Sequence, residues 1–508
     1  MIIVKLNKAD FEYDIHSLIK AFFPKEDVRV TAVNKIFSGM ISLFLEIEYD
    51  NSEIKFVLYQ PDLELEYTEQ MWEQLPAENA AFREEFMIKT EGDDRSERKN
   101  KLKQGLYRLL KKNTKQELPW GTLTGIRPVK IPMAFLAQGK SEDDICRYMK
   151  DTYFVSDEKI DLSMEIAKKE LELLSAIDYC DGYSLYIGIP FCPTTCLYCS
   201  FTSYPAKTWE QKMESYIEAV EREIDFTSVN LRHLKLNTIY IGGGTPTTLN
   251  PMLMERLLTK IERSFDFSNL IEYTVEAGRP DSITQDKLAV LKKHGITRIS
   301  INPQTMNQKT LDLIGRKHTI SQTEESYHLA RKLGFDNINM DLIVGLPGET
   351  YEDVLHTLDE IKRLAPDSLT VHSLAVKRAS ALRNYKEEHP DTGMVNTQAM
   401  IEAAAKAAKE MDMFPYYLYR QKNMAGNYEN VGYSKQDKSG LYNILIMEEK
   451  QSIIAIGAGA ITKYVVDGGN TIERSENVKD ISNYLERIDE MVERKRSCFE
   501  KFIESEKK

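Results

Sequence analysis

Three cysteines are crowded into the stretch GIPFCPTTCLYCSF, which runs from Gly188 to Phe201. Cys192, Cys196 and Cys199 follow the spacing C-x-x-x-C-x-x-C, although the whole chain has only six cysteines. Thiolates are soft ligands that suit zinc, copper(I) or iron–sulfur clusters. A structural zinc site takes four ligands, usually from two separated C-x-x-C halves, and no second half is visible in this sequence.

Three thiolates leave a metal centre one ligand short. Iron–sulfur clusters are ordinarily held by four thiolates, so a four-iron cluster on three would keep one iron free for a substrate or cofactor. The same open position separates catalytic from structural zinc. The alternative is three unrelated buried cysteines, which a single loop rich in Pro and Thr fits poorly. We therefore interpret the loop as an incomplete ligand set with a vacant position.

Other residues that could do chemistry follow five further β-rich runs. Barrel and open α/β enzymes place their sites at the carboxyl ends of their strands, so these residues would converge on the rim that carries the cysteines. Each has a structural alternative, such as a helix cap for the first carboxylate or a lysine partner for the second. In chain order they are Gly242–Gly243–Gly244–Thr245–Pro246, Glu276, Asn302 with Gln304, Asp341 and His372.

The elements that must position these residues alternate between strand and helix. Six β-rich runs occupy residues 184–189, 237–242, 271–276, 297–302, 337–343 and 367–373. Amphipathic helical patterns lie between them at 209–224, 252–263, 283–294, 321–333 and 351–364. This alternation predicts an α/β fold with a parallel sheet and right-handed crossovers. Six units are too few for an eight-fold barrel but suit a partial barrel or an open sheet.

The pattern changes along the chain predict four parts. Residues 1–115 mix alternating and helical stretches and predict an N-terminal α+β accessory domain. Residues 116–180 begin with a Gly/Pro-punctuated segment and predict a helical junction. Residues 181–390 hold the partial barrel. Residues 391–508 begin with a helix and continue with mixed elements, which predicts a C-terminal α/β domain.

Composition excludes several classes of protein. Sixty-seven Lys and Arg residues against 79 Asp and Glu give the 508-residue chain a formal net charge of −12, which argues against a general nucleic-acid or membrane-surface binder. The first residues, MIIVKLNKADFEYD, are neither a signal peptide nor a membrane span. Cys146, Cys180 and Cys498 have no recognisable spacing, which favours a reducing cytoplasm over a secreted, disulfide-linked protein.

The cysteine spacing after a first strand resembles the signature of the radical S-adenosylmethionine (SAM) superfamily, and Tyr198 before the third cysteine fits it as well. The resemblance implies a partial (βα)6 TIM-like barrel, in agreement with the six units counted above. It also implies two cofactors, a [4Fe–4S] cluster on Cys192, Cys196 and Cys199 and S-adenosyl-L-methionine on the free iron. Reductive cleavage of SAM in that superfamily yields a 5′-deoxyadenosyl radical.

Short sequence motifs along residues 180–380 resemble those of the oxygen-independent coproporphyrinogen III oxidase family. That family includes coproporphyrinogen dehydrogenases and a heme chaperone branch. The motifs are YIGIPFC, IYIGGGTPT, TVEAGRP, ISINPQT, IGRKHT and DLIVGLPGET. The extension with WGTLTGIRPVKI and the tail YYLYRQKNMAGNYENVGY resemble the longer, oxidase-like bacterial variant. Carried over by position, the resemblance implies SAM-binding roles for Tyr186, Gly243, Gly244, Thr245, Glu276, Gln304, Arg316 and Asp341. Glycines admit backbone groups close to a charged ligand, and the guanidinium of Arg316 suits a carboxylate.

The sequence departs from the family at two positions. Coproporphyrinogen dehydrogenases usually carry a fourth cysteine two residues after the third, where this chain has Phe201. Phenylalanine there is typical of the chaperone and oxidase-like branches. The chaperone branch carries a heme-binding His-Asn pair, and Lys422 replaces that histidine here.

The resemblance implies a cytoplasmic enzyme that converts two propionates of coproporphyrinogen III to vinyls, with an electron donor such as a flavodoxin or ferredoxin. A heme chaperone and a radical SAM enzyme acting on another tetrapyrrole-like substrate are the alternatives. A tetra-anionic substrate needs local cations, and the candidates are Lys377, Arg378, Arg420 and Lys422. The sequence does not specify catalytic residues, the oligomeric state, a second SAM site or the role of the N-terminal part.

Overall fold

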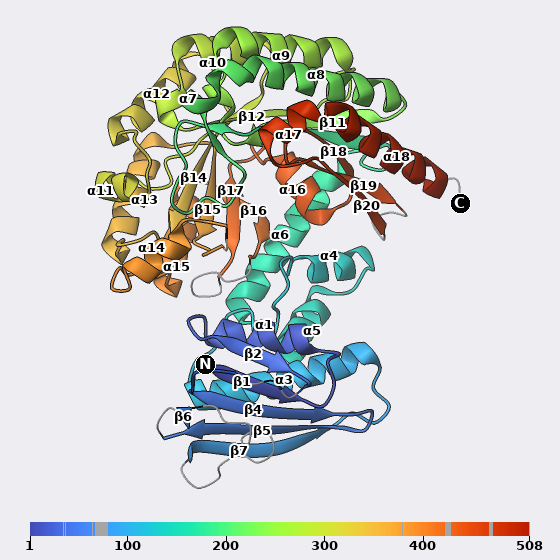
Figure 1. Ribbon diagram of the computed structural model, residues 1–508, viewed down its shortest axis with the longest axis vertical. Helices are drawn as coiled ribbons and strands as arrows, with labels where there is room; N and C mark the ends of the chain where they lie inside the picture. Colours follow the sequence, from blue (N-terminus) through green and yellow to red (C-terminus); the bar gives the residue numbers. More distant parts are fainter. Residues whose placement is uncertain are drawn as a thin grey trace. The chain divides into compact units, whose positions relative to one another are not determined.

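The computed structural model describes most of the chain, in two compact units. One unit comprises Met1–Met164 with Arg420–Tyr428, and the other comprises Glu165–Tyr419 with Glu429–Lys508. Figure 1 shows the elements of both units coloured along the sequence. The residues that the structure describes are 1–33, 35, 37–62, 65–66, 80–377, 379–421, 428–466 and 471–506.

The first unit contains a five-stranded mixed sheet in the order β2-β1-β4-β5-β7. β1 runs parallel to β2 and β4, whereas β4, β5 and β7 are antiparallel neighbours. Residues of α1 and α3 share the apolar core of this sheet. The strands of the unit are β1 (Ile2–Leu6), β2 (Val28–Thr31), β3 (Met40–Ile41), β4 (Leu43–Tyr49), β5 (Glu53–Pro61), β6 (Leu65–Glu66) and β7 (Ala80–Lys89). Its helices are α1 (Glu12–Phe22), α3 (Arg95–Thr114), α4 (Lys130–Ala137) and α5 (Glu142–Tyr153), and α6 (Asp157–Ser175) begins there.

Six parallel strands form the centre of the second unit, as the alternation of runs predicted. Each strand pairs with the next one along the chain, in the order β8-β11-β12-β13-β14-β15. The expected α/β partial barrel is therefore confirmed as an open, curved parallel sheet (Figure 1). The strands are β8 (Gly182–Ile189), β11 (Lys235–Gly243), β12 (Glu272–Gly278), β13 (Arg298–Ile301), β14 (Ile338–Val344) and β15 (Ser368–Ser373).

Helices follow these strands and cover the outer face of the sheet (Figure 1). In α8, Tyr216, Ile217, Val220 and Ile224 are buried at helical spacing, which accounts for the amphipathic pattern in the sequence. Side-chain caps define several helix starts, for example Thr319 of the capping box at α12. The helices are α7 (Ala206–Trp209), α8 (Met213–Asn230), α9 (Pro251–Ser264), α10 (Gln285–Lys293), α11 (Gln308–Leu313), α12 (Ile320–Lys332), α13 (Tyr351–Leu364), α14 (Leu382–Glu388) and α15 (Gln398–Glu410).

The residues predicted as a C-terminal domain extend this same sheet at both edges. β17 pairs antiparallel with β15, and β18 pairs parallel with β8. An open barrel leaves the backbone groups of its edge strands unpaired, and these C-terminal strands satisfy them. Whether residues 391–508 fold as a separate domain remains a prediction, as do the other boundaries. The elements are β16 (Phe414–Tyr419), β17 (Asn430–Ser434), α16 (Leu441–Glu448), β18 (Ser452–Ile456), β19 (Ile461–Val466), β20 (Thr471–Glu476), α17 (Ile481–Glu486) and α18 (Ile488–Glu506).

A buried ion pair joins the C-terminal helix to α8. Lys495 of α18 donates to Glu223 of α8, and neither side chain is exposed to solvent. Glu223 also accepts from the backbone N–H of Gly457, at 2.9 Å, at the end of β18. Gly457 lies against the carbonyl of Gly188, which in turn accepts from the Tyr216 hydroxyl at 2.6 Å. The network therefore connects the C-terminal helix to the strand that leads into the cysteine loop.

Among the helices of the described residues, none is both long and apolar enough to cross a membrane.

Candidate functional site

The three cysteines lie on the loop that leaves β8, at the carboxyl edge of the parallel sheet. Cys192 ends the short strand β9 (Phe191–Cys192), which pairs with β10 (Tyr204–Pro205). Cys196 is buried, whereas Cys192 and Cys199 are partly exposed, and all three are free thiols. No group of three or more His, Cys, Asp or Glu side chains in the described ranges is close enough to hold a metal ion as it stands. The loop therefore carries the predicted ligands without gathering their sulfur atoms into a preformed site.

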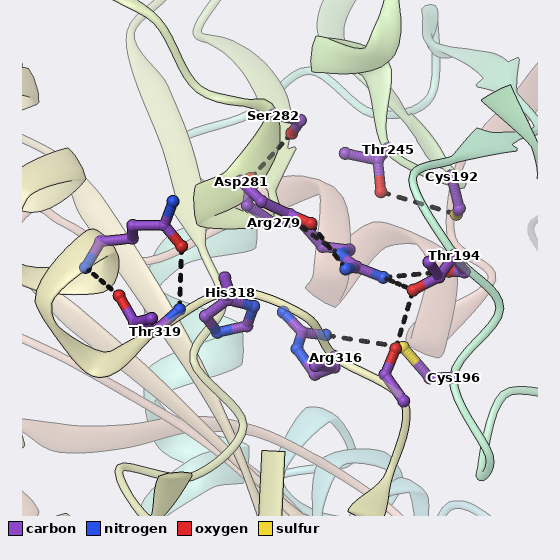
Figure 2. Close-up of polar contacts among 12 residues, drawn as sticks. Cys192, Thr194, Cys196, Thr245, Arg279, Asp281, Ser282, Arg316, His318 and Thr319 are labelled. Atoms are coloured by element: carbon purple, nitrogen blue, oxygen red, sulfur yellow. Dashed lines mark hydrogen bonds and ion pairs between the residues drawn. The ribbon is translucent and has the colours of Figure 1, made fainter. Parts of the chain in front are cut away.

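Arg279, which the sequence analysis did not single out, holds this loop from the end of β12. Its Nη1 donates to both the carbonyl oxygen and Oγ1 of Thr194, at 3.0 and 2.6 Å, in the middle of the cysteine loop. Its Nε and Nη2 donate to the carboxylate of Asp281 at 3.0 and 2.7 Å (Figure 2). Only 3% of Arg279 is exposed, so its position is fully determined by these partners. The sequence signal that could have identified it is an arginine three residues after the predicted strand 271–276, in the motif TVEAGRP.

Arg316 also contacts the cysteine loop. Its Nη1 donates to the Tyr198 hydroxyl at 3.1 Å and lies 4.0 Å from the sulfur of Cys196. Its Nη2 donates to the backbone carbonyl of Asn302. The resemblance implied a carboxylate partner for this guanidinium, but two of its nitrogens are engaged within the protein. The buried Nε has no hydrogen-bond partner.

The glycine-rich turn after β11 is hydrogen-bonded directly to the cysteine loop. The N–H of Gly244 donates to Ile189 O at 2.8 Å, and the N–H of Thr245 donates to Phe191 O at 2.7 Å. A Cβ on Gly244 would lie 2.7 Å from both of these carbonyl oxygens, so only glycine fits. The hydroxyl of Thr245 lies 3.5 Å from the sulfur of Cys192 (Figure 2).

Glu276 lies beneath this turn among stacked tyrosines. The Tyr240 hydroxyl donates to the Glu276 carboxylate, and the Tyr240 ring stacks on Tyr186 and Tyr442 with centroids 6.3 and 4.5 Å apart. Burial raises the pKa of Glu276 to about 7, and the nearby carboxylate of Asp341 adds to the rise. Tyr186 was predicted to lie at the site. Tyr240 and Tyr442 were not, because their stacking depends on contacts between distant segments.

Gln304 and Asp341 meet at the middle of β14. The N–H of Gln304 donates to Asp341 O at 2.9 Å, and Gln304 has a φ of 69°, an unusual backbone conformation for a residue other than glycine. The buried side-chain oxygen of Gln304 has no hydrogen-bond partner. Backbone strain and an unsatisfied buried acceptor in one residue are typical of a functional position.

Hydrogen bonds hold the Asp341 carboxylate in its charged form. Asn339 Nδ2 donates to Asp341 Oδ1 at 2.7 Å, and His372 Nε2 lies 3.9 Å from Oδ2. Burial raises the pKa of Asp341, but the contacts with His372, Asn339 and Thr370 outweigh it, so the net shift is downward. Glu276 and Asp341 are thus two neighbouring carboxyl groups whose pKa values are pushed apart.

His318 is a further buried residue of the site that the sequence analysis did not single out. It is fully buried, and neither ring nitrogen has a hydrogen-bond partner. Figure 2 shows it beside Arg316. Burial and the charge of Arg316 lower the pKa of His318 to about 3, so the imidazole is neutral at physiological pH.

Two of the predicted cations, Lys377 and Arg420, belong to different units. Lys377 follows β15 and lies beside the cysteine loop, with its Nζ 5.6 Å from the centroid of the Phe201 ring. Arg420 belongs to the first unit, where it donates to the carbonyl of Leu123 and lies over the ring of Trp120. Arg378 and Lys422 lie outside the described residues.

The donor chemistry of the loop fits an iron–sulfur cluster with an open iron. Burial raises the pKa of the Cys192 thiol to about 11 and also raises that of Cys199. Thiols coordinate metal only as thiolates, so binding must release these protons. The charge of Arg279 favours the thiolate of Cys192, and the charge of Lys377 favours that of Cys199. The Arg316 Nε and the Gln304 oxygen, both buried and unpartnered, are suited to the polar groups of a small cofactor.

The sequence and structure are similar to those of known proteins. Residues 186–361 match the Radical SAM superfamily. The chain is 43% identical over 410 residues to the oxygen-independent coproporphyrinogen-III oxidase-like protein HemZ of Bacillus subtilis (strain 168). These residues make up 80% of this chain and 82% of that relative. It is 32% identical over 308 residues to the heme chaperone HemW of the same organism, covering 60% and 76%. Its structure matches that of the coproporphyrinogen III oxidase (HemN) from Escherichia coli with a TM-score of 0.49 and 22% identity, over 63% of this chain and 73% of that one.

Proposed function

The chain belongs to the family of oxygen-independent coproporphyrinogen III oxidase-like proteins, and from this premise we propose that it is a radical SAM enzyme acting on coproporphyrinogen III. The proposed reaction converts two propionate side chains to vinyl groups. Each propionate gives up a hydrogen atom from its β-carbon, then carbon dioxide, and its last electron passes to an external acceptor. When bound, the family's [4Fe–4S] cluster and SAM supply the hydrogen-atom abstraction.

The observation that carries the proposal is the convergence of the cysteine loop, the glycine-rich turn and two carboxyl groups at one edge of six parallel strands. Cys192, Cys196 and Cys199 would hold the cluster. The turn formed by Gly243, Gly244 and Thr245 would place backbone groups beside the methionine end of SAM. Gly243 has a φ of 100°, a conformation that glycine adopts without strain. These assignments rest on the placement of the residues and on the family to which the chain belongs.

The remaining predicted residues would bind and orient SAM through its charged groups. The carboxylates of Glu276 and Asp341 suit the α-ammonium group of the ligand, and the free Nε of Arg316 suits its carboxylate. The unsatisfied side-chain oxygen of Gln304 would accept a hydrogen bond from a hydroxyl or amino group. The ring of Tyr186, stacked on Tyr240, would give the proposed SAM site an apolar wall.

Heme binding without decarboxylation is the second candidate function. It is supported by the similarity to the heme chaperone HemW and by Phe201, where a dehydrogenase would carry cysteine. Against it, Lys422 stands where the resemblance places an axial histidine, and lysine is not the usual protein ligand of heme iron.

One anaerobic experiment separates the two functions. The full chain would be reconstituted with iron and sulfide, reduced with a flavodoxin or ferredoxin system, and mixed with SAM and coproporphyrinogen III. We expect both 5′-deoxyadenosine and protoporphyrinogen, detected by mass spectrometry. 5′-Deoxyadenosine without decarboxylated product would contradict the proposed substrate. Neither product, together with stoichiometric binding of hemin, would support the chaperone function instead.

A further inference from the structure

The cysteine loop ends in an aromatic ring that faces solvent. Phe201 follows Cys199 by two residues, and 70% of its surface is exposed. A single exposed apolar side chain is ordinary on a protein surface, so its neighbours decide whether it has a role.

The neighbour of this ring is a lysine. The Nζ of Lys377 lies 5.6 Å from the centroid of the Phe201 ring, within the range of a cation–π contact. Lys377 itself is partly buried, and across the residues that the structure describes it forms no ion pair. A partly desolvated ammonium group without a carboxylate is costly, and an anionic ligand would offset that cost.

The two residues are held in place by the packing of their segments. The loop around Leu197 and the segment after β15 are joined by a hydrogen bond from the N–H of Leu382 to Leu197 O, at 2.9 Å. Leu197, Tyr198 and Val376 also pack against one apolar cluster. The ring and the ammonium group are therefore presented together, next to the loop that carries the cluster ligands.

We propose that Phe201 and Lys377 form a docking subsite for one propionate-bearing pyrrole ring of a tetrapyrrole. The exposed face of Phe201 would stack on the pyrrole, and the Lys377 ammonium would pair with its propionate carboxylate. A flat aromatic ring beside one cation matches this ligand, because each pyrrole of the substrate combines an aromatic face with a carboxylate. This subsite rests on the proposed function, since it requires that the chain binds a tetrapyrrole.

The test uses coproporphyrin III, the stable oxidised form, as the probe. Its affinity for the anaerobically reconstituted full chain is measured by porphyrin fluorescence for wild type, Lys377→Met and Phe201→Leu. We expect Lys377→Met to weaken binding about tenfold and Phe201→Leu about fivefold. The tetramethyl ester of coproporphyrin III has no carboxylates, so its affinity should respond to Phe201→Leu alone. Lys332→Met and Met252→Leu, at exposed positions on α12 and α9, are the matched controls and should bind like wild type.

The outcomes separate this proposal from the proposed function. Unchanged affinity in both variants, with normal binding by wild type, would overturn the subsite while leaving the function intact. A wild-type chain that binds neither coproporphyrin III nor hemin would overturn both. If the variants instead slow reduction of the cluster by reduced flavodoxin while porphyrin affinity stays unchanged, the surface serves an electron donor and the subsite is wrong.

Discussion

Arg279 Nη1 donates to Thr194 Oγ1 at 2.6 Å, which links the end of the third parallel strand to the middle of the cysteine loop. The same guanidinium forms an ion pair with Asp281, so one buried side chain connects the loop to the 3-10 turn that follows β12. Thr194 Oγ1 in turn donates to Gly315 O at 2.8 Å, next to Arg316. These side-chain contacts hold the ligand loop in addition to the pairing of β9 with β10 and the backbone hydrogen bonds from the glycine-rich turn.

Replacing Arg279 should loosen this loop. In Arg279→Met, Thr194 loses its donor and Asp281 loses its charge partner, so we expect the free energy of unfolding to fall by about 2–3 kcal/mol. The reconstituted protein should also lose iron faster than wild type on dilution into a chelator. Denaturant unfolding and iron release measure the two effects. Arg256→Met, which removes the partly exposed ion pairs of this arginine with Glu221, Glu214 and Glu218, is the control and should cost about 1 kcal/mol or less. Wild-type iron retention in Arg279→Met would show that the loop does not depend on this arginine.

The cluster assignment predicts different effects for different cysteines. Cys196→Ala removes a ligand, so the reconstituted variant should lack iron–sulfur absorbance and should not cleave SAM. Cys180→Ala, at an exposed cysteine that precedes the loop, should keep both. Absorbance that survives in Cys196→Ala at wild-type intensity would mean that the loop is not the ligand set.

The pKa of Glu276 predicts a pH-dependent stability. Its pKa is raised to about 7 in the folded chain, so the folded state retains a proton that the unfolded chain releases above the ordinary glutamate pKa of 4.5. Stability is therefore lost progressively as the pH rises from about 4.5 to 7, and the penalty is complete above 7. Glu276→Gln removes the titrating group and keeps an acceptor for Tyr240. Urea unfolding measures the free energy of unfolding of the variant and of wild type at both pH values. The variant minus wild-type difference should be more positive at pH 8.5 than at pH 4.5.

A carboxylate with the opposite shift is the control for this experiment. Lys235 lowers the pKa of Asp178 through their hydrogen bond, so Asp178 is charged in the folded state across the whole window. The difference in stability between Asp178→Asn and wild type should then stay nearly constant from pH 5 to 8.5. An equal pH response in the Asp178 and Glu276 variants would contradict the raised pKa of Glu276.

The buried ion pair of Lys495 and Glu223 predicts that the C-terminal helix contributes to the free energy of unfolding. Lys495→Met leaves a carboxylate without its cation in a fully buried position, which should lower the free energy of unfolding by about 3–5 kcal/mol. Lys260→Met breaks the exposed pair with Asp225 and should cost about 1 kcal/mol or less. Thermal or urea unfolding compares the two. Glu223 also accepts hydrogen bonds from Gly457, Asn477 and Tyr484, and equal costs would mean that these bonds stabilise its carboxylate sufficiently.

The sequence by itself determined the alternation of strand and helix and the composition of the cysteine loop. Both are local properties: apolar periodicity reports which face of an element is buried, and the cysteine spacing needs no distant partner to be read. The polar residues after each run were likewise predictable, because parallel strands end at one edge of a sheet. The backbones of Gln304 and Asp341 are hydrogen-bonded, although Asp341 lies within β14 and does not follow it.

Only the tertiary structure decided what surrounds these residues. Arg279 and Arg316 turn out to hold the cysteine loop, Tyr442 reaches the Tyr240 ring from a C-terminal helix, and β17 and β18 complete the open edges of the barrel sheet. Each of these contacts joins segments far apart in the chain, and nothing in a local pattern states which distant segment will pair with which. These segments pair because buried charges and buried backbone groups need partners. That need arises only once the whole sheet has formed and has buried those groups.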